Sequence, residues 1–160
     1  MEEPLITYFA AEKQEALLFI LVGSLAVAMS VWMFVTGSHY KGMAYPLIAV
    51  AAIQFAVGGT VYFRTDGQVS ALKAQYQQAP AVFKAEETKR MAVVVKNFKV
   101  YKWIEIALLA AGLLLAFIFR GHDTWYAVGL GLVIQSALML AADLVAEHRA
   151  DEYLKFVAGT

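Results

Sequence analysis

The chain has 160 residues, of which 61% are hydrophobic and 16% are charged, and its formal net charge is zero. A chain of this length forms one domain, and its balanced charge points to no nucleic-acid or other polyanionic partner. The lack of cysteine excludes disulfide bonds, iron–sulfur clusters and thiol chemistry.

Four apolar runs occupy about half of the sequence, at residues 16–36, 43–63, 103–119 and 125–142. Each is close to the ~20 residues that a helix needs to cross ~30 Å of hydrocarbon. In a soluble protein of this size, such helices would need polar outer faces. The pattern therefore predicts an all-α fold, an integral membrane four-helix bundle that forms a single membrane domain over residues 1–160.

Lysine and arginine are distributed unevenly between the links that join these runs. Eight of the 13 lie between residues 64 and 102, whereas the two shorter links contain only Lys41 and Arg120. Positively charged links stay in the cytoplasm. Both termini and the central segment are therefore expected in the cytoplasm, with the lipid bilayer as immediate partner.

The central segment, residues 66–102, is predicted to be a helical extension between spans two and three. Pro80 is suited to the first turn of a helix, and no glycine or proline interrupts residues 81–111. One helix from about residue 80 to residue 119 would be ~60 Å long, twice the thickness of the hydrocarbon. Its apolar residues fall on one stripe at helical spacing, namely Phe83, Met91, Val94, Phe98 and Tyr101.

Two further inner segments complete the predicted extension. Residues 64–78 are interpreted as a capped connection with a turn or helix start at residues 65–67, and residues 143–157 as an inner C-terminal helix. The apolar stripe favours packing of these helices on one another, and the alternative is a docking surface for a partner.

Four charged residues are expected at one depth, the inner membrane boundary: Arg64, Lys102, Glu105 and Asp143. In the structural interpretation they are salt bridges, with Arg64 or Lys102 paired to Glu105 or Asp143. In the functional interpretation they form a ring that controls an ion or proton pathway. The structural interpretation is preferred, because the polar residues expected near mid-depth, such as Gln135, are uncharged.

Residues that could form a metal or catalytic site are few. His39, His122 and Asp123 lie on the outer links, but their spacing matches no metal-binding motif, so no metal or cofactor is predicted. No nucleophile elbow, phosphate-binding loop or catalytic carboxylate pair is present in the sequence, so an enzyme is not expected.

Glycines and inner charges give two further sets of candidates. Gly58, Gly59, Gly129 and Gly131 lie within apolar runs and are interpreted as points where helices approach closely. On the inner side, a partner surface is predicted around Arg90, Lys96 and Glu147.

Six sequence strings together carry a family resemblance. They are Tyr8-Phe9 with residues 12–15, and residues 40–46, 61–66, 87–91, 96–102 and 142–150. These strings resemble a group of small four-span bacterial membrane proteins that are similar to immunity proteins of polymorphic or type VI secretion toxins. The likeness covers nearly the whole chain, and it implies a non-enzymatic protein of the bacterial inner membrane that neutralises a membrane-acting toxin domain by binding and occlusion. No catalytic residues come with it.

Two other functions remain open. A small channel or transporter subunit would use Glu105, Asp143 and Gln135, but at mid-depth no span is broken by a proline or an unwound glycine pair, with the exception of Gly58-Gly59. A scaffold subunit of a larger membrane complex fits the sequence as well as an immunity protein does.

Overall fold

The computed structural model describes residues 2–159 and is all-α over that range, which confirms the all-α part of the predicted fold class. Its four long helices are α1 (Glu2–Val35), α2 (Ala44–Gln78), α3 (Pro80–Ile118) and α4 (Asp123–Ala158), and a short 3₁₀ helix, η1 (Lys41–Met43), precedes α2. All four long helices are long and apolar enough to cross a membrane.

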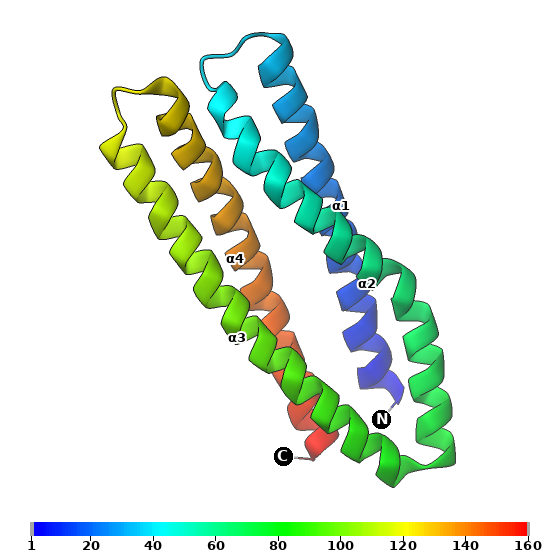
Figure 1. Cartoon of the computed structure of the whole chain (residues 1–160). Coiled ribbons are helices and arrows are strands. Elements are labelled where there is room, and N and C mark those ends of the chain that lie inside the picture. The colour runs from blue at the N-terminus through cyan, green and yellow to red at the C-terminus, as the bar shows by residue number, and fades with distance from the viewer. Residues whose placement is uncertain (1, 160) are drawn as a thin grey trace.

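The helices form two antiparallel hairpins that lie side by side, α1 with α2 and α3 with α4 (Figure 1). The hairpins meet mainly where α4 lies against η1 and α2, whereas no Cα atoms of α1 and α3 come within 8 Å of each other. Both described termini and the α2–α3 turn lie at one end, here named the terminal end, and the two hairpin loops lie at the other, the loop end (Figure 1).

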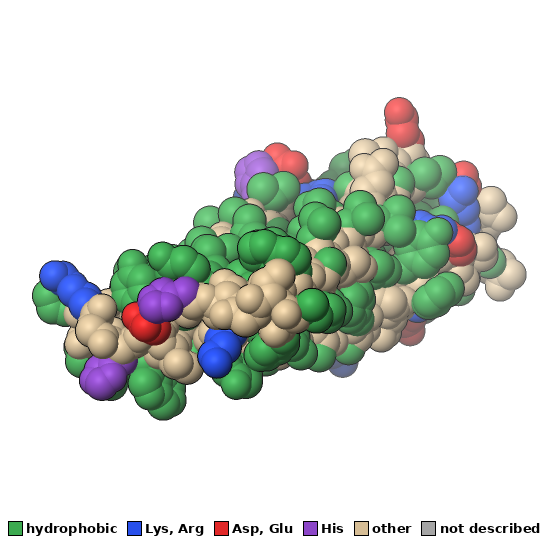
Figure 2. Space-filling model, turned by 90° about the horizontal axis from the view of Figure 1, so that it is seen from above, with side chains coloured by type: hydrophobic (Ala, Val, Ile, Leu, Met, Phe, Trp, Pro, Cys, Tyr) green, Lys and Arg blue, Asp and Glu red, His purple; other side chains and the backbone are tan. Residues whose placement is uncertain are grey.

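Hydrophobic side chains cover much of the exterior between these ends. Figure 2 shows them over most of the visible surface, with charged side chains gathered towards the two ends. Leu25, Trp32, Phe63 and Phe117 are among the large exposed hydrophobic residues. A helix that is apolar on all sides is typical of a protein core or of a membrane span.

The predicted turn at residues 65–67 is wrong, because α2 continues through it to Gln78. The Thr65 hydroxyl donates to the Val61 carbonyl at 2.6 Å, and Lys13 of α1 pairs with Asp66 at 2.6 Å, so polar groups typical of a turn are satisfied in a helix. Gly67 in a helix interior costs only about 1 kcal/mol. Figure 1 shows α2 bending along this part, where such side-chain bonds to the preceding turn are known to bend helices.

The helix ends have local causes. Ala79 adopts φ −148°, as residues before proline favour an extended backbone, and α3 then begins at Pro80 as expected. At the other terminus Gly159 adopts φ +77°, and its N–H donates to the Lys155 and Phe156 carbonyls and closes α4.

A hydrophobic core at the terminal end joins α1, α3 and α4. Tyr8 stacks on Tyr153 with ring centroids 4.5 Å apart, and Phe9 meets both rings edge-on. The inner helices therefore pack on one another, as the favoured interpretation held. The buried core residues are Leu5, Tyr8, Phe9, Phe83, Met91, Val95, Ala150, Tyr153 and Val157.

The buried row of α3 differs in part from the predicted stripe. Phe83, Glu87, Met91 and Val95 recur every four residues and are buried, whereas Tyr101 is exposed. The row follows the side along which α3 packs on α4, and its Phe83 and Met91 share a core with side chains from the first turns of α1. The apolar runs predict no helix before residue 16, although the spacing of Leu5, Tyr8 and Phe9 is itself typical of an amphipathic helix.

Three of the four predicted glycines lie at close helix contacts. A Cβ added to Gly58 would lie 2.8 Å from the Ala16 carbonyl oxygen, one on Gly129 2.6 Å from the Ala116 nitrogen, and one on Gly131 2.9 Å from the Met43 carbonyl oxygen. Gly59 has no neighbour within 4 Å of that position. Gly58, Gly129 and Gly131 thus allow helix backbones to approach within the chain, whereas Gly59 faces outwards.

The core predicts a large difference between adjacent residues of α3. Phe83→Ala removes a fully buried ring and should lower the free energy of unfolding of the purified protein by about 3–5 kcal/mol. Val82 is 48% exposed, so Val82→Ala should change the free energy of unfolding by less than about 0.5 kcal/mol. Thermal unfolding followed by circular dichroism measures both, and equal effects would contradict the described core.

Candidate functional site

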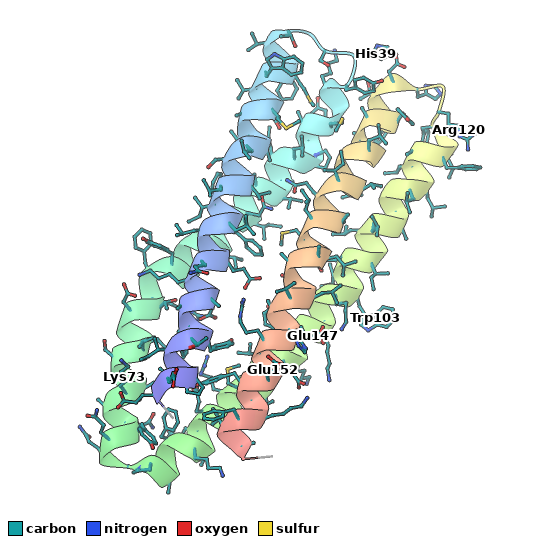
Figure 3. The ribbon with its side chains drawn as sticks, turned by 180° about the vertical axis from the view of Figure 1, so that it is seen from behind. His39, Lys73, Trp103, Arg120, Glu147 and Glu152 are labelled. Atoms are coloured by element: carbon teal, nitrogen blue, oxygen red, sulfur yellow. The ribbon has the colours of Figure 1, made fainter. Side chains whose placement is uncertain are left out.

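A layer of ion pairs lies between the terminal-end core and the apolar parts of the helices. Arg64 of α2 pairs with Glu12 of α1 at 3.4 Å, and Arg149 of α4 pairs with Glu15 of α1. Figure 3 labels Glu147, which lies at this level of α4. The Arg149–Glu15 pair joins one hairpin to the other, whereas Arg64 and Glu12 belong to the same hairpin.

The predicted pairing of Arg64 or Lys102 with Glu105 or Asp143 is wrong. Arg64 pairs with Glu12, and Lys102 donates to Glu147 at 2.5 Å. The reason is that α1 is helical from its first turns and brings Glu12 within reach of α2. The four predicted residues therefore do not form one ring.

Glu105 and Asp143 are brought together instead, as a carboxyl pair between α3 and α4. Both residues are more than nine-tenths buried, and their carboxyl groups are neighbours. The Oε2 atom of Glu105 contacts no hydrogen-bonding group of the described chain. Within residues 2–159 neither carboxyl forms an ion pair with lysine, arginine or histidine.

Two buried glutamines continue this polar column towards the loop end. The Gln54 amide donates to the Met139 sulfur at 3.5 Å, one turn along α4 from Asp143. Both amide atoms of Gln135 and the amide oxygen of Gln54 contact no hydrogen-bonding group of the described chain. Each unpaired buried polar group lowers the folding stability by about 1–3 kcal/mol. These amides are therefore candidates for a functional role.

An apolar cluster closes the column on its loop-end side. The cluster joins α1, η1, α2 and α4, and the partly buried Val27 and Leu130 pack against it. The described polar residues therefore form a column that stops short of the loop end. The buried members of the cluster are Ala26, Met33, Met43, Leu47, Ala51 and Ala127.

The three residues of the predicted partner surface differ in whether they are engaged within the chain. Arg90 is held within the chain, because its Nε and Nη2 atoms each donate to the buried Glu87 carboxylate at 2.7 Å and its guanidinium lies 5.4 Å from the Phe9 ring centroid. Glu147 is occupied by Lys102. Lys96 is exposed and forms no ion pair with the described residues. Of the three, only Lys96 suits contact with a partner.

Burial changes the electrostatics of the acidic residues that α1 contributes. It raises the pKa of the Glu12 and Glu15 carboxyls, while Arg64 acts on the first and Arg149 on both in the opposite direction. Burial likewise raises the pKa of the Tyr8 and Tyr153 hydroxyls above their usual range. The arginines thus oppose the effect of burial on both carboxyl groups.

The loop end contains one histidine–carboxylate contact. His39 Nε2 lies 3.0 Å from Asp123 Oδ1 and joins the two hairpin loops, and Figure 3 labels His39 there. Across residues 2–159 no three histidine, aspartate or glutamate side chains are grouped closely enough to hold a metal ion.

No protein family, curated protein or solved structure matches this chain. Its function must therefore be inferred from its own residues.

The Arg90–Glu87 pair predicts a strong effect of a neutral substitution. Arg90→Gln would leave the Glu87 carboxylate buried without its cation and should lower the free energy of unfolding by about 3–5 kcal/mol. Lys96→Gln removes the same charge from an exposed position and should change the free energy of unfolding by less than about 0.5 kcal/mol. If chemical denaturation finds the two variants equally stable, Arg90 is not part of the core.

Proposed function

We propose that the chain is an integral protein of the bacterial inner membrane, with its terminal end and both termini in the cytoplasm. Four helices of sufficient length and apolarity, with an apolar exterior between polar ends, support membrane insertion. The concentration of lysine and arginine between residues 64 and 102, at the terminal end, supports the orientation.

Cysteine labelling tests this orientation, because the natural chain has no cysteine. Gly121 lies in the α3–α4 loop and Gln78 ends α2, and both are exposed. In intact spheroplasts a membrane-impermeant maleimide should label Gly121→Cys and leave Gln78→Cys unlabelled until the membrane is opened. The reverse pattern would overturn the orientation.

We infer that the cytoplasmic part binds another protein, and an exposed stripe on α3 carries this inference. Val93 and Val100 are 54% and 48% exposed, and the side chains of Lys89 and Lys96 lie on the same side of the helix. This side is opposite to the buried row that contains Met91. Valine and lysine in one stripe fit a partner helix that is apolar and acidic.

The proposed partner is a membrane-acting toxin, which the chain would neutralise by occlusion as an immunity protein. The resemblance to such proteins supports this choice. The ion pairs and the aromatic core that join α1 to α4 support it physically, since a rigid surface loses little conformational freedom on binding. Occlusion needs no catalytic group.

Closure of the polar column supports binding over ion transport. The column contains Glu105, Asp143 and Gln135, as a conducting route would, but the apolar cluster at the loop end separates it from that side. Desolvating an ion across such a cluster is costly. A scaffold subunit would use the same α3 stripe, so the experiment must separate these two roles.

If the chain is an immunity protein, its toxin should be encoded by a neighbouring gene. The test expresses that toxin together with this chain, with protection of growth and pull-down of the toxin as readouts. Val93→Asp with Lys96→Glu should weaken toxin binding at least about tenfold, equivalent to about 1.4 kcal/mol, and abolish protection. Lys73→Glu makes the same charge reversal on α2, away from α3 in Figure 3, and should protect normally.

A second variant tests lateral contact within the membrane. Gly59 faces open space, so Gly59→Leu should leave folding intact and block a toxin helix that packs there. Full protection by both the stripe variant and Gly59→Leu would overturn the immunity proposal. A growth defect on deletion in a toxin-free strain would favour the scaffold role, and ion flux through the purified protein would favour transport.

A further inference from the structure

A groove of about 300 Å³ runs between α1 and α4, where the two hairpins meet. Its end towards the termini is lined by Ala11, Gln14 and Arg149, and its other end by Leu18 and Ala142. The groove therefore changes from polar to apolar along its length, in the direction that leads from the ion-pair layer into the apolar helices.

The apolar end is open to the surroundings of the protein. Leu18 and Val145, from opposite walls, are 51% and 63% exposed, and Leu18 belongs to the first apolar run of the sequence. In the proposed membrane orientation, hydrocarbon chains of the inner leaflet would meet these two side chains. An acyl chain lying between them would cover exposed apolar surface from both hairpins.

The polar end has two opposite charges side by side. Arg149 and Glu15 form an ion pair and both line the groove. The pair uses only part of their hydrogen-bonding capacity, because a guanidinium has five N–H donors and a carboxylate accepts at both oxygens. The Arg149 Nε atom has no acceptor within the described chain. Further hydrogen bonds would help to offset the burial that raises the pKa of Glu15.

We propose that this groove binds phosphatidylethanolamine, and this inference rests on the membrane location proposed above. The lipid phosphate accepts hydrogen bonds from Arg149, its ammonium group donates to Glu15, and an acyl chain lies along Leu18 and Val145. The negative phosphate thus faces the Arg149 guanidinium and the positive ammonium group faces the Glu15 carboxylate, with a charge-assisted hydrogen bond at each.

Other lipid headgroups match these charges less well. Phosphatidylcholine has the same net charge, but its quaternary ammonium has no N–H to donate to Glu15. Phosphatidylglycerol has a phosphate for Arg149 but no cation for Glu15, which would face an uncompensated negative charge. Because α1 and α4 belong to different hairpins, bound phosphatidylethanolamine would also hold the hairpins together.

The test titrates the purified full chain in detergent with lipids that share the same acyl chains. Native mass spectrometry and thermal unfolding follow the binding. Phosphatidylethanolamine should bind at least about tenfold more tightly than phosphatidylcholine or phosphatidylglycerol and should raise the unfolding temperature. Free phosphoethanolamine, which lacks acyl chains, should not bind at the same concentrations. Equal affinities for the three lipids, or equal binding of phosphoethanolamine, would overturn the proposal.

Three variants separate binding from folding. Val145→Trp fills the apolar end at an exposed position, so it should abolish the lipid-dependent rise and leave the unfolding temperature without lipid unchanged. Glu15→Gln should remove the preference for phosphatidylethanolamine over phosphatidylcholine. Lys102→Gln breaks an ion pair outside the groove and should retain that preference. A preference that survives both groove variants would overturn the site.

Cell fractionation distinguishes this inference from the proposed function. If the chain is extracted from membranes by alkaline carbonate, the membrane location itself fails, and the lipid site fails with it. If the chain stays in the membrane and neutralises its toxin but shows no lipid preference, only the lipid site fails.

Discussion

Packing of the first turns of α1 against α4 is the constraint on which the rest of the structure depends. Each hairpin has its own close contacts, such as Gly58 against α1 and Gly129 against α3, but these act within one hairpin. The stacked Tyr8 and Tyr153 rings join the first helix to the last. Around them the same core buries Phe83 of α3, so three helices share one hydrophobic centre. Aromatic pairs of this kind contribute about 0.5–1.5 kcal/mol beyond the area they bury.

Ion pairs near this core add to the contacts that hold the helices in place. Buried or half-buried acids of α1 and α3 each meet an arginine, as Glu15 meets Arg149 and Glu87 meets Arg90. Removing one partner of such a pair is costly because the other stays buried. Of the two, the Glu15–Arg149 pair joins the hairpins and disfavours other alignments, whereas Glu87 and Arg90 both belong to α3. The Glu105–Asp143 pair differs, since it has no cation within ion-pair distance in the described chain.

With the core and the ion pairs held inside, two surfaces remain for interactions. The valine and lysine stripe of α3 lies in the proposed cytoplasmic part and suits a protein partner. The groove between α1 and α4 lies at the proposed membrane boundary and suits a lipid. The two are compatible, because a lipid that joins the hairpins would stiffen the body from which the α3 stripe projects. Both surfaces exist because each helix is apolar towards the loop end and carries charged residues towards the terminal end.

The sequence by itself determined the four helices, their apolar lengths and the start of α3 at Pro80, because hydrophobic runs and proline act locally. It also placed Glu105 and Asp143 at one level. Only the tertiary structure decided which charges pair, that α2 continues through Thr65, and that Arg90 lies in the core while Lys96 stays outside. Pairing across the hairpins depends on α1, which contacts residues far along the chain, as Tyr8 contacts Tyr153 and Glu15 contacts Arg149. Local periodicity contains no information about which distant helix covers a given face, so contacts of that range come only from the folded chain.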